Sequence, residues 1–300
     1  MLASRVVRLV SFWLLSLVLF WDPLSKLGAL SWRDSQYSYI ILIPVVSACF
    51  AYIERSAILF RPAYCPVAGG PLLLLGGLVY LAGCISWFGL GDTGRLSVMV
   101  FAIVLIWAAG FLLFYGKESF RAAAFPLGLL LMMVPLPAVF LAKVVAALQT
   151  GSAEVAYALF RLGQIPVFRE GLRFSLPGVD IEVAPECSGI HSTVSLFLAS
   201  LVAAHLFLNG PGKKICFSLA SILVVVLKNG VRIATLSWLG AYVDPAYLHG
   251  KLHHDYGGVV FSLLAFAILV PLLVLLRDPG ILRNLLSLQL IVKRRAAVSR

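Results

Sequence analysis

The segment Glu182-Val-Ala-Pro-Glu-Cys-Ser-Gly-Ile-His-Ser192 carries the chain from a polar, proline-containing stretch into a long apolar one, and Cys187 lies at the junction. The apolar run predicts a helix whose first turn holds the cysteine. The N-terminal end of a helix favours a thiolate, because unpaired N–H groups and the positive end of the helix dipole lie there. Cys187 is therefore either a reactive nucleophile or a buried cysteine that acts as a small hydrophobic side chain.

The composition around this segment is that of a membrane protein. Of the 300 residues, 61% are hydrophobic and only 12% are charged, whereas a soluble domain carries about twice that share of charge. A membrane-spanning helix needs about 20 apolar residues. We therefore predict an all-α polytopic membrane protein of about eight transmembrane helices, over residues 9–21, 37–52, 71–90, 96–115, 125–148, 188–208, 215–234 and 257–276.

Two of these spans need comment. The run 9–21 is interpreted as a retained first span rather than a signal peptide, because no small-residue cleavage site follows it. The span 125–148 contains Pro126, Pro135 and Pro137, and each proline removes a helix hydrogen bond, so we expect it to be kinked or broken. The predicted organisation is a single transmembrane domain over 1–280 and a basic cytoplasmic tail over 281–300.

The net charge of +11 bears on partners and orientation. The basic residues lie between apolar spans, where anionic lipid headgroups and topology signals explain them, so we expect no nucleic-acid partner. Most Lys and Arg residues fall on the side that holds both termini, which predicts cytoplasmic N- and C-termini. The five cysteines are scattered without metal-ligand or disulfide spacing, so no metal and no cofactor are predicted.

The connection at about 149–186 is predicted to be the one long extracytoplasmic loop, and it is expected to start with a helix-like piece over residues 154–162. Apolar residues alternate with polar ones over 172–176 and again over 179–183, and Pro177-Gly178 separates the two runs. This pattern predicts a small β-hairpin just before the Cys187 helix. The hairpin is either a lip over Cys187 or a surface loop without a role in a site.

Three chemically active residue types reach one membrane level in this topology. Arg232 lies 17 residues after Ile215, and a helix rises about 26 Å over that length, so Arg232 reaches the outer interface near Cys187. His253 and His254 precede the last span at the same face. An arginine at this depth marks a functional site or snorkels to the interface.

These residue types suit acyl transfer through a cysteine. A histidine takes the thiol proton and returns it to the leaving amine, while a fixed cation stabilises the oxyanion. The base is open among His253, His254 and His191, the last of which lies four residues after Cys187 on the same helix face.

The motifs resemble the signature segments of the exosortase/archaeosortase family of membrane transpeptidases. These motifs are Glu186-Cys-Ser-Gly-Ile190, Asn229-Gly-Val-Arg-Ile233 and His253-His-Asp-Tyr-Gly257. Asp34-Ser-Gln-Tyr-Ser38 and Val134-Pro-Leu-Pro137 are similar to two further family segments, although Tyr39 stands where the family commonly has His.

The resemblance implies a bacterial inner-membrane cysteine transpeptidase or peptidase. Its substrates would be membrane-anchored proteins with a C-terminal Pro-Glu-Pro-like sorting tag, cleaved through a thioester at the extracytoplasmic side. The acyl group would pass to an exopolysaccharide or lipid-linked acceptor, or to water. The alternative function is a non-catalytic membrane component of polysaccharide export or assembly.

The same resemblance assigns residue roles. Cys187 would be the nucleophile, Arg232 the transition-state stabiliser and a histidine before Gly257 the acid/base, with His253 preferred over His254. The residues that would bind substrate or support the site are Glu186, Ser188, Gly189, His191 and Asn229.

Overall fold

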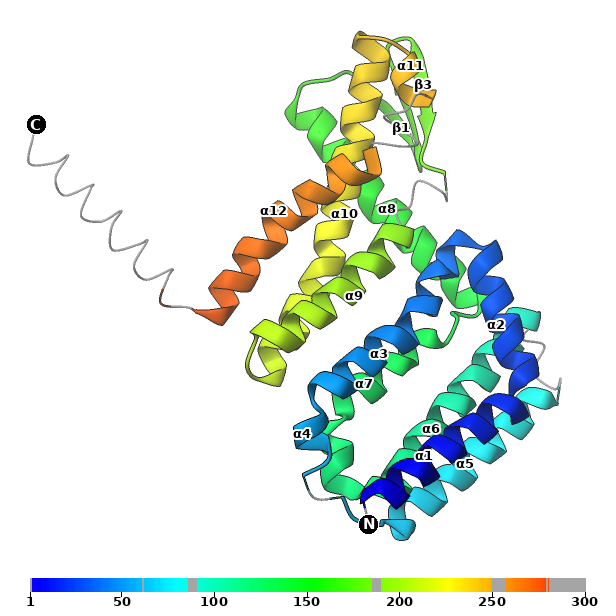
Figure 1. Ribbon diagram of the computed structural model, residues 1–300. Coiled ribbons are helices and arrows are strands. Elements are labelled where there is room, and N and C mark those ends of the chain that lie inside the picture. The colour runs from blue at the N-terminus through cyan, green and yellow to red at the C-terminus, as the bar shows by residue number, and fades with distance from the viewer. Residues whose placement is uncertain are drawn as a thin grey trace, which may run out of the picture. The chain divides into compact units, whose positions relative to one another are not determined.

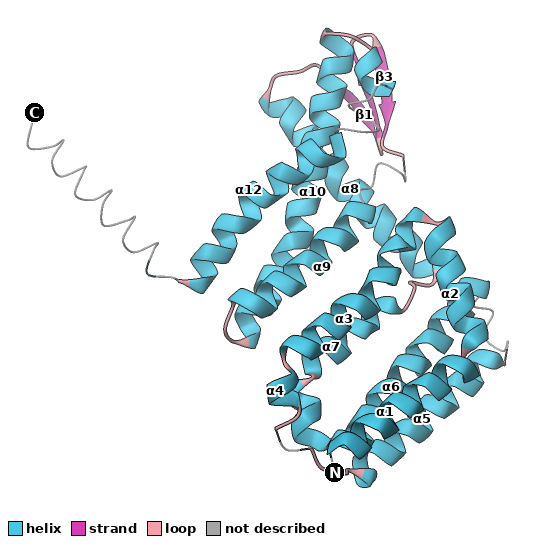
Figure 2. Ribbon diagram, viewed as in Figure 1, coloured by secondary structure: helices cyan, strands magenta, loops and turns pink. Residues whose placement is uncertain are grey.

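The computed structural model describes residues 2–60, 62–85, 91–184, 190–249, 257–278 and 280, and these are mostly helical (Figures 1 and 2). Six described helices are long and apolar enough to cross a membrane, or seven if the bent pair at the N-terminus is one span. The described chain is thus mostly helical, which agrees with the predicted all-α, multi-pass membrane protein. The expected number of about eight is not reached by length and hydropathy alone, because one span is broken and another, Ser192–Phe207, is short in its described part.

The described chain forms two compact units, Met1–Ala142 and Lys143–Arg300. The secondary structure described in the first unit is helical, with short non-helical connections such as residues 62–65 and 134–137, and its longest helices are α5 (Pro66–Cys84) and α6 (Gly91–Ala122). Gly69, Gly76 and Gly83 recur every seven residues along α5, and a Cβ atom at Gly76 would lie 2.7 Å from Ile106 Cγ1. Small residues let transmembrane helices approach closely, so these three glycines allow α5 to pack tightly against α6. The elements are α1 (Leu2–Leu19), α2 (Trp21–Arg33), η1 (Ser35–Ile41), α3 (Leu42–Ile53), α4 (Arg55–Ile58), α5 (Pro66–Cys84), α6 (Gly91–Ala122), α7 (Ala124–Leu129) and η2 (Leu130–Met133).

The proline-rich segment after α6 is broken, as its sequence predicts. Helix α7 passes into η2, and residues 134–137 are extended before the next helix begins. Backbone carbonyl groups in this segment accept side-chain hydrogen bonds: Pro126 from Ser47 Oγ at 2.7 Å and Pro135 from Ser97 Oγ at 2.6 Å. Hydroxyl side chains of neighbouring helices thus satisfy backbone groups that a broken helix leaves without helical partners.

The second unit carries the β-structure. Its three short strands are β1 (Phe168–Glu170), β2 (Arg173–Leu176) and β3 (Val179–Glu182). They form an antiparallel sheet in the order β1-β2-β3, and β2 pairs with β3 so that Arg173 lies opposite Glu182. The sheet packs on α8 and α10 through buried apolar residues, with Phe160 and Phe174 edge to face at 5.7 Å. The elements are α8 (Ala138–Leu162, from Lys143 onward), β1 (Phe168–Glu170), β2 (Arg173–Leu176), β3 (Val179–Glu182), α9 (Ile190–Phe207), α10 (Pro211–Tyr242), α11 (Ala246–His249) and α12 (Gly257–Arg277).

Two expectations for this region need correction. The sheet has three strands where a two-stranded hairpin was expected, because residues 168–170 add to the edge of β2. Helix α8 runs without a break to Leu162. The predicted helix-like piece over 154–162 is therefore confirmed, but residues 149–153 are helical too and join it to the preceding span, so the non-helical connection starts only after Leu162. The reason is packing: Ala153, Ala156 and Phe160 on one face of α8 are fully buried, which holds this stretch in helical form.

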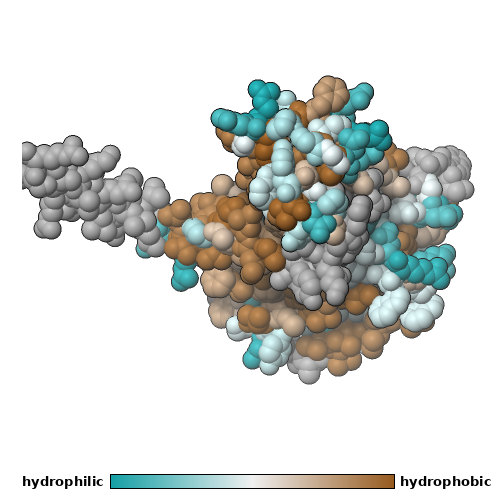
Figure 3. Space-filling view, turned by 90° about the horizontal axis from the view of Figure 1, so that it is seen from above, coloured by the Kyte–Doolittle hydropathy of each residue, from teal (hydrophilic) through white to brown (hydrophobic). Residues whose placement is uncertain are grey.

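A second core in this unit joins α9, α10 and α12 through residues such as Leu196, Val225 and Ala265. Outside the cores, large apolar side chains are exposed, among them Val18 on α1 and Leu223 on α10. Figure 3 shows broad apolar areas beside hydrophilic ones on one face of the molecule. Apolar exposure on this scale is expected where lipid, rather than water, surrounds the helices.

Candidate functional site

The structure describes only part of the predicted site. Glu186, Cys187, Ser188, Gly189, His253 and His254 lie outside the described residues, as does the side chain of His191. Asn229 and Arg232 are described, and both lie on α10. Asn229 is 1% exposed, and Arg232 is half-buried. The predicted meeting of Cys187, Arg232 and a histidine therefore stays a prediction, whereas the surroundings of Asn229 and Arg232 on α10 belong to the described structure.

The first turn of α9 lies beside the turn of α10 that precedes Arg232. Lys228 Nζ donates a hydrogen bond to Ser192 Oγ at 2.9 Å. Ser192 is the third residue of the described α9, and Lys228 is four residues before Arg232, so Lys228 and Arg232 share a face of α10. Lys228 is 5% exposed. A cation buried this far inside an apolar helix is costly and marks a functional position by default.

The Asn229-Gly230 pair fixes α10 against α8. Asn229 Nδ2 donates to Ser152 Oγ at 3.0 Å, and Ser152 is fully buried. A Cβ atom at Gly230 would lie 2.4 Å from Val155 Cβ and 2.9 Å from the Ser152 carbonyl oxygen. Only glycine allows this approach, so the motif that precedes Arg232 is also the crossing point of two helices.

The strand that leads toward Cys187 is held by the same helix. Gln149 is 7% exposed on α8, and its Nε2 donates to the Val183 carbonyl oxygen at 2.8 Å, just after the end of β3. Gln149 and Ser152 are three residues apart and thus neighbours on one face of α8. One face of α8 therefore positions both the approach to residues 185–189 and the turn of α10 that carries Arg232.

Two ion pairs involve the sheet, one between β1 and α8 and one between β2 and β3. Arg169 of β1 donates to Glu154 of α8 at 2.8 Å, and the Arg169 side chain is only 17% exposed. The hydrogen bond to Glu154 raises the pKa of the Arg169 guanidinium above its ordinary value, because the carboxylate stabilises the charged form. Arg173 and Glu182 pair across β2 and β3 at 3.2 Å, with both side chains largely exposed, and such pairs contribute little to stability.

Chemically, the described part of the site offers two fixed positive charges, Lys228 and Arg232, one helical turn apart. Cations at fixed positions in a water-poor site stabilise developing negative charge. The part of the chain that the structure describes contains no group of three or more His, Cys, Asp or Glu residues that could hold a metal ion.

Several residues around this site did not stand out in the sequence. Gln149 and Ser152 lie in a stretch expected to be loop, and Ser192 lies in an ordinary apolar helix. Lys228 carried a usable signal, because a lysine in the middle of an apolar run is rare. The hydrogen-bonded pairs form only because α8, α9 and α10 pack against one another, and the sequence pattern does not predict that packing.

Comparison with known proteins adds one finding. Residues 31–270 match the family described as transmembrane exosortase. This range covers most of the 300 residues and contains the Cys187 segment, the Asn229 to Ile233 motif and the His253 segment. No curated protein and no solved structure matches the chain.

Proposed function

The chain belongs to the transmembrane exosortase family, and on that premise we propose that it is a membrane cysteine transpeptidase that removes the C-terminal sorting signal of exported proteins. The observation that carries the proposal is the Lys228–Ser192 hydrogen bond. It brings the start of the helix that follows Cys187 beside the turn of α10 that precedes Arg232. This neighbourhood supports a nucleophile and a cation that act on the same carbonyl group.

The reaction would proceed in two steps. The Cys187 thiolate attacks the scissile carbonyl carbon, and Arg232 stabilises the oxyanion of the tetrahedral intermediate. The C–N bond breaks, the imidazolium of His253 or His254 protonates the leaving amine, and a thioester remains on Cys187. An acceptor nucleophile, or water, then gives its proton to the histidine and releases the acyl group.

The supporting residues have distinct proposed roles. Asn229 keeps the Arg232 turn against α8, as its bond to Ser152 supports. Glu186, Ser188, Gly189 and His191 flank Cys187 in sequence and would bind the tag or support the nucleophile. Substrates would be membrane-anchored proteins with a Pro-Glu-Pro-like tag, and the acceptor an exopolysaccharide or lipid-linked molecule.

The proposed location is the bacterial inner membrane, with the site on the extracytoplasmic side. The bent pair α1–α2 and the broken segment α7–α8 each count as one crossing in this topology. Together with α3, α5, α6, α9, α10 and α12 they would make eight crossings. An even number puts both termini on the same side of the membrane, and the distribution of Lys and Arg favours the cytoplasm for that side. Basic residues at both ends then meet anionic headgroups.

The test is co-expression with a tagged candidate protein, followed by mass measurement of the new C-terminus. The native chain should shorten the tagged protein near its motif, whereas Cys187→Ala and Arg232→Ala should leave it intact with the enzyme still in the membrane. Cys216→Ala is the matched control, because Cys216 is exposed near the start of α10, and it should retain processing.

The same assay separates the histidines and the alternative function. Loss of processing in His253→Ala but not in His254→Ala or His191→Ala would assign the acid/base to His253. Full processing by Cys187→Ala would overturn the enzymatic proposal. Polysaccharide export that tolerates Cys187→Ala would then favour a non-catalytic export component.

A further inference from the structure

A pocket with a basic lining lies in the first unit, between α2 and the first turns of α6. Its volume is ≈ 490 Å³, and three basic side chains line it: Lys26, Arg33 and Arg95. Asp92 is the one carboxylate among the described lining residues, and Leu96 and Met99 supply apolar walls. The described lining therefore carries a net positive charge and has apolar walls. The proposed reaction uses none of these residues.

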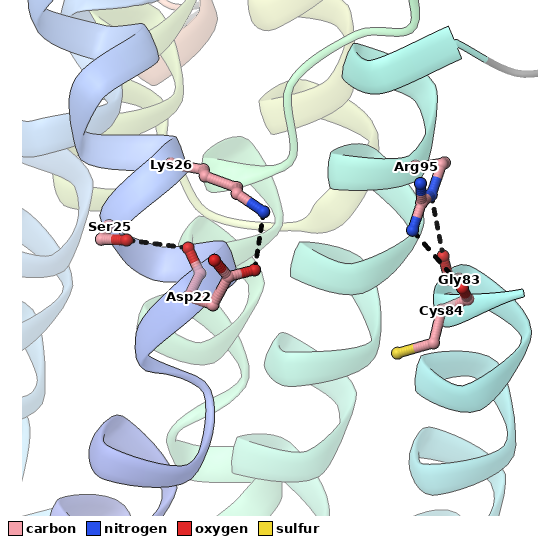
Figure 4. A network of polar contacts seen from close by, with 6 residues as sticks. All are labelled: Asp22, Ser25, Lys26, Gly83, Cys84 and Arg95. Atoms are coloured by element: carbon pink, nitrogen blue, oxygen red, sulfur yellow. Dashed lines mark hydrogen bonds and ion pairs between the residues drawn. The ribbon is translucent and has the colours of Figure 1, made fainter. Parts of the chain in front are cut away.

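The basic side chains keep donors for a ligand. Arg95 Nε and Nη2 lie 3.5 and 3.4 Å from the Gly83 and Cys84 carbonyl oxygens at the C-terminal end of α5 (Figure 4). These contacts are long for hydrogen bonds, and a guanidinium has five N–H donors. Lys26 pairs with Asp22 at 2.8 Å, but both side chains are mostly exposed, 65% and 71%. Such a pair is weak and exchanges readily for another anion.

The pocket lies where the headgroups of a bilayer would be. Helices α1 and α2 are bent by 76° relative to each other, so α2 does not continue the line of α1. On α2, Pro23, Leu27 and Ser31 are buried at four-residue spacing, while Asp22, Lys26 and Arg33 are exposed. An amphipathic helix of this kind lies along a membrane interface, and Asp92 and Arg95 belong to the first turns of α6.

We propose that this pocket binds a membrane lipid whose headgroup carries a phosphate. Lys26, Arg33 and Arg95 would hold the phosphate, since basic pockets between membrane helices are typical lipid-headgroup sites. Leu96 and Met99 would contact the start of the lipid chain. Asp92 accepts hydrogen bonds from hydroxyl groups, which favours a headgroup with a glycerol or a sugar next to the phosphate. Phosphatidylglycerol and a polyprenyl-phosphate sugar share this chemistry.

The test uses the full-length protein in detergent and counts bound lipid by native mass spectrometry over a lipid titration. One arm offers phosphatidylglycerol and the other a polyprenyl-phosphate sugar. The triple variant Lys26→Gln, Arg33→Gln, Arg95→Gln should weaken binding of the bound lipid at least tenfold. The control triple Arg55→Gln, Lys117→Gln, Arg121→Gln removes the same charge from exposed positions of the same unit and should change affinity less than twofold.

Each outcome either supports or overturns the proposed lipid site. Selective loss in the pocket triple with either lipid supports the site, and the lipid that binds tighter identifies its source. Equal weakening in both triples means that only bulk charge attracts lipid, and no weakening in the pocket triple means that lipid binds elsewhere; both overturn the proposal. If the pocket triple does not fold, Arg33→Gln against Arg55→Gln makes the same comparison. Binding is measured without any cleavage, so the result is independent of the proposed function.

Discussion

Asn229 Nδ2 lies 3.0 Å from Ser152 Oγ, and this hydrogen bond joins two side chains that are both almost fully buried between α10 and α8. The next residue, Gly230, has no room for a side chain against Val155. The two residues before Val231-Arg232 therefore set the position of α10 on α8. Since Gln149 on the same face of α8 holds the end of the strand that leads to residues 185–189, helix α8 serves as the common support of the candidate site.

Gly230→Ala should lower the thermal stability of the protein in detergent. A Cβ atom would lie 2.4 Å from Val155 Cβ, and overpacking a tight contact costs about 1–3 kcal/mol. The matched control is Gly77→Ala on α5, where a Cβ atom meets nothing within 4 Å and where alanine is the better helix former. A thermal melt that ranks Gly230→Ala at or above Gly77→Ala would contradict the close approach.

Lys228→Met should separate stability from activity. Lys228 is 5% exposed, and replacing a buried charge by an apolar side chain of similar length is often neutral or stabilising. We therefore expect an undiminished melting temperature together with about a 10²-fold loss of processing, the effect typical of losing one fixed electrostatic group. Lys228→Arg keeps the charge and should recover part of the rate.

The control for this substitution is Lys214→Met, which removes a less buried lysine from the first turn of the same helix. It should process at the native rate. Native processing by Lys228→Met would show that the buried charge is dispensable. A strongly lowered melting temperature would show instead that the lysine acts through folding.

The sequence was informative where a pattern has a local cause. The apolar runs predicted the membrane class, the three prolines of 125–148 predicted the break, and the alternation around Phe174 and Ile181 predicted β-structure before the Cys187 helix. The helix-like piece over 154–162 was predicted, but its continuity with the preceding span through residues 149–153 was not, because Gln149 and Ser152 look like loop until their partners are known.

For the candidate site, the motif residues could be named from the sequence, but the residues that hold them in place through hydrogen bonds could not. The partners of Gln149 and Asn229 are 34 and 77 residues away along the chain. Such pairs depend on how the helices pack, and periodicity describes each helix alone. Lys228 is the exception, because its cost in an apolar helix can be read without a partner.

Gln149→Leu should destabilise the attachment of the sheet. The substitution leaves the buried Val183 carbonyl oxygen without its 2.8 Å partner, and an unsatisfied buried acceptor costs about 1–3 kcal/mol. Limited proteolysis should then cut residues 163–184 faster than in the native protein. Gln164→Leu removes an exposed glutamine after the end of α8 and should leave the rate unchanged; equal acceleration in both variants would refute the role of Gln149.

A membrane-impermeant thiol reagent should distinguish the two ends of α10. This helix has 32 residues, about 48 Å at 1.5 Å per residue, so it exceeds the roughly 30 Å hydrocarbon layer and its ends reach both faces. Cys216 is exposed in the second turn, whereas Arg232 lies 16 residues further on, about 24 Å along the axis. In the proposed topology, reagent added outside intact cells reaches the Arg232 end only. Single-cysteine variants should therefore be labelled at Cys187 and spared at Cys216, with Cys216 labelled after the membrane is opened. Labelling of Cys216 from outside would reverse the orientation and place the candidate site in the cytoplasm, where it could not meet exported proteins.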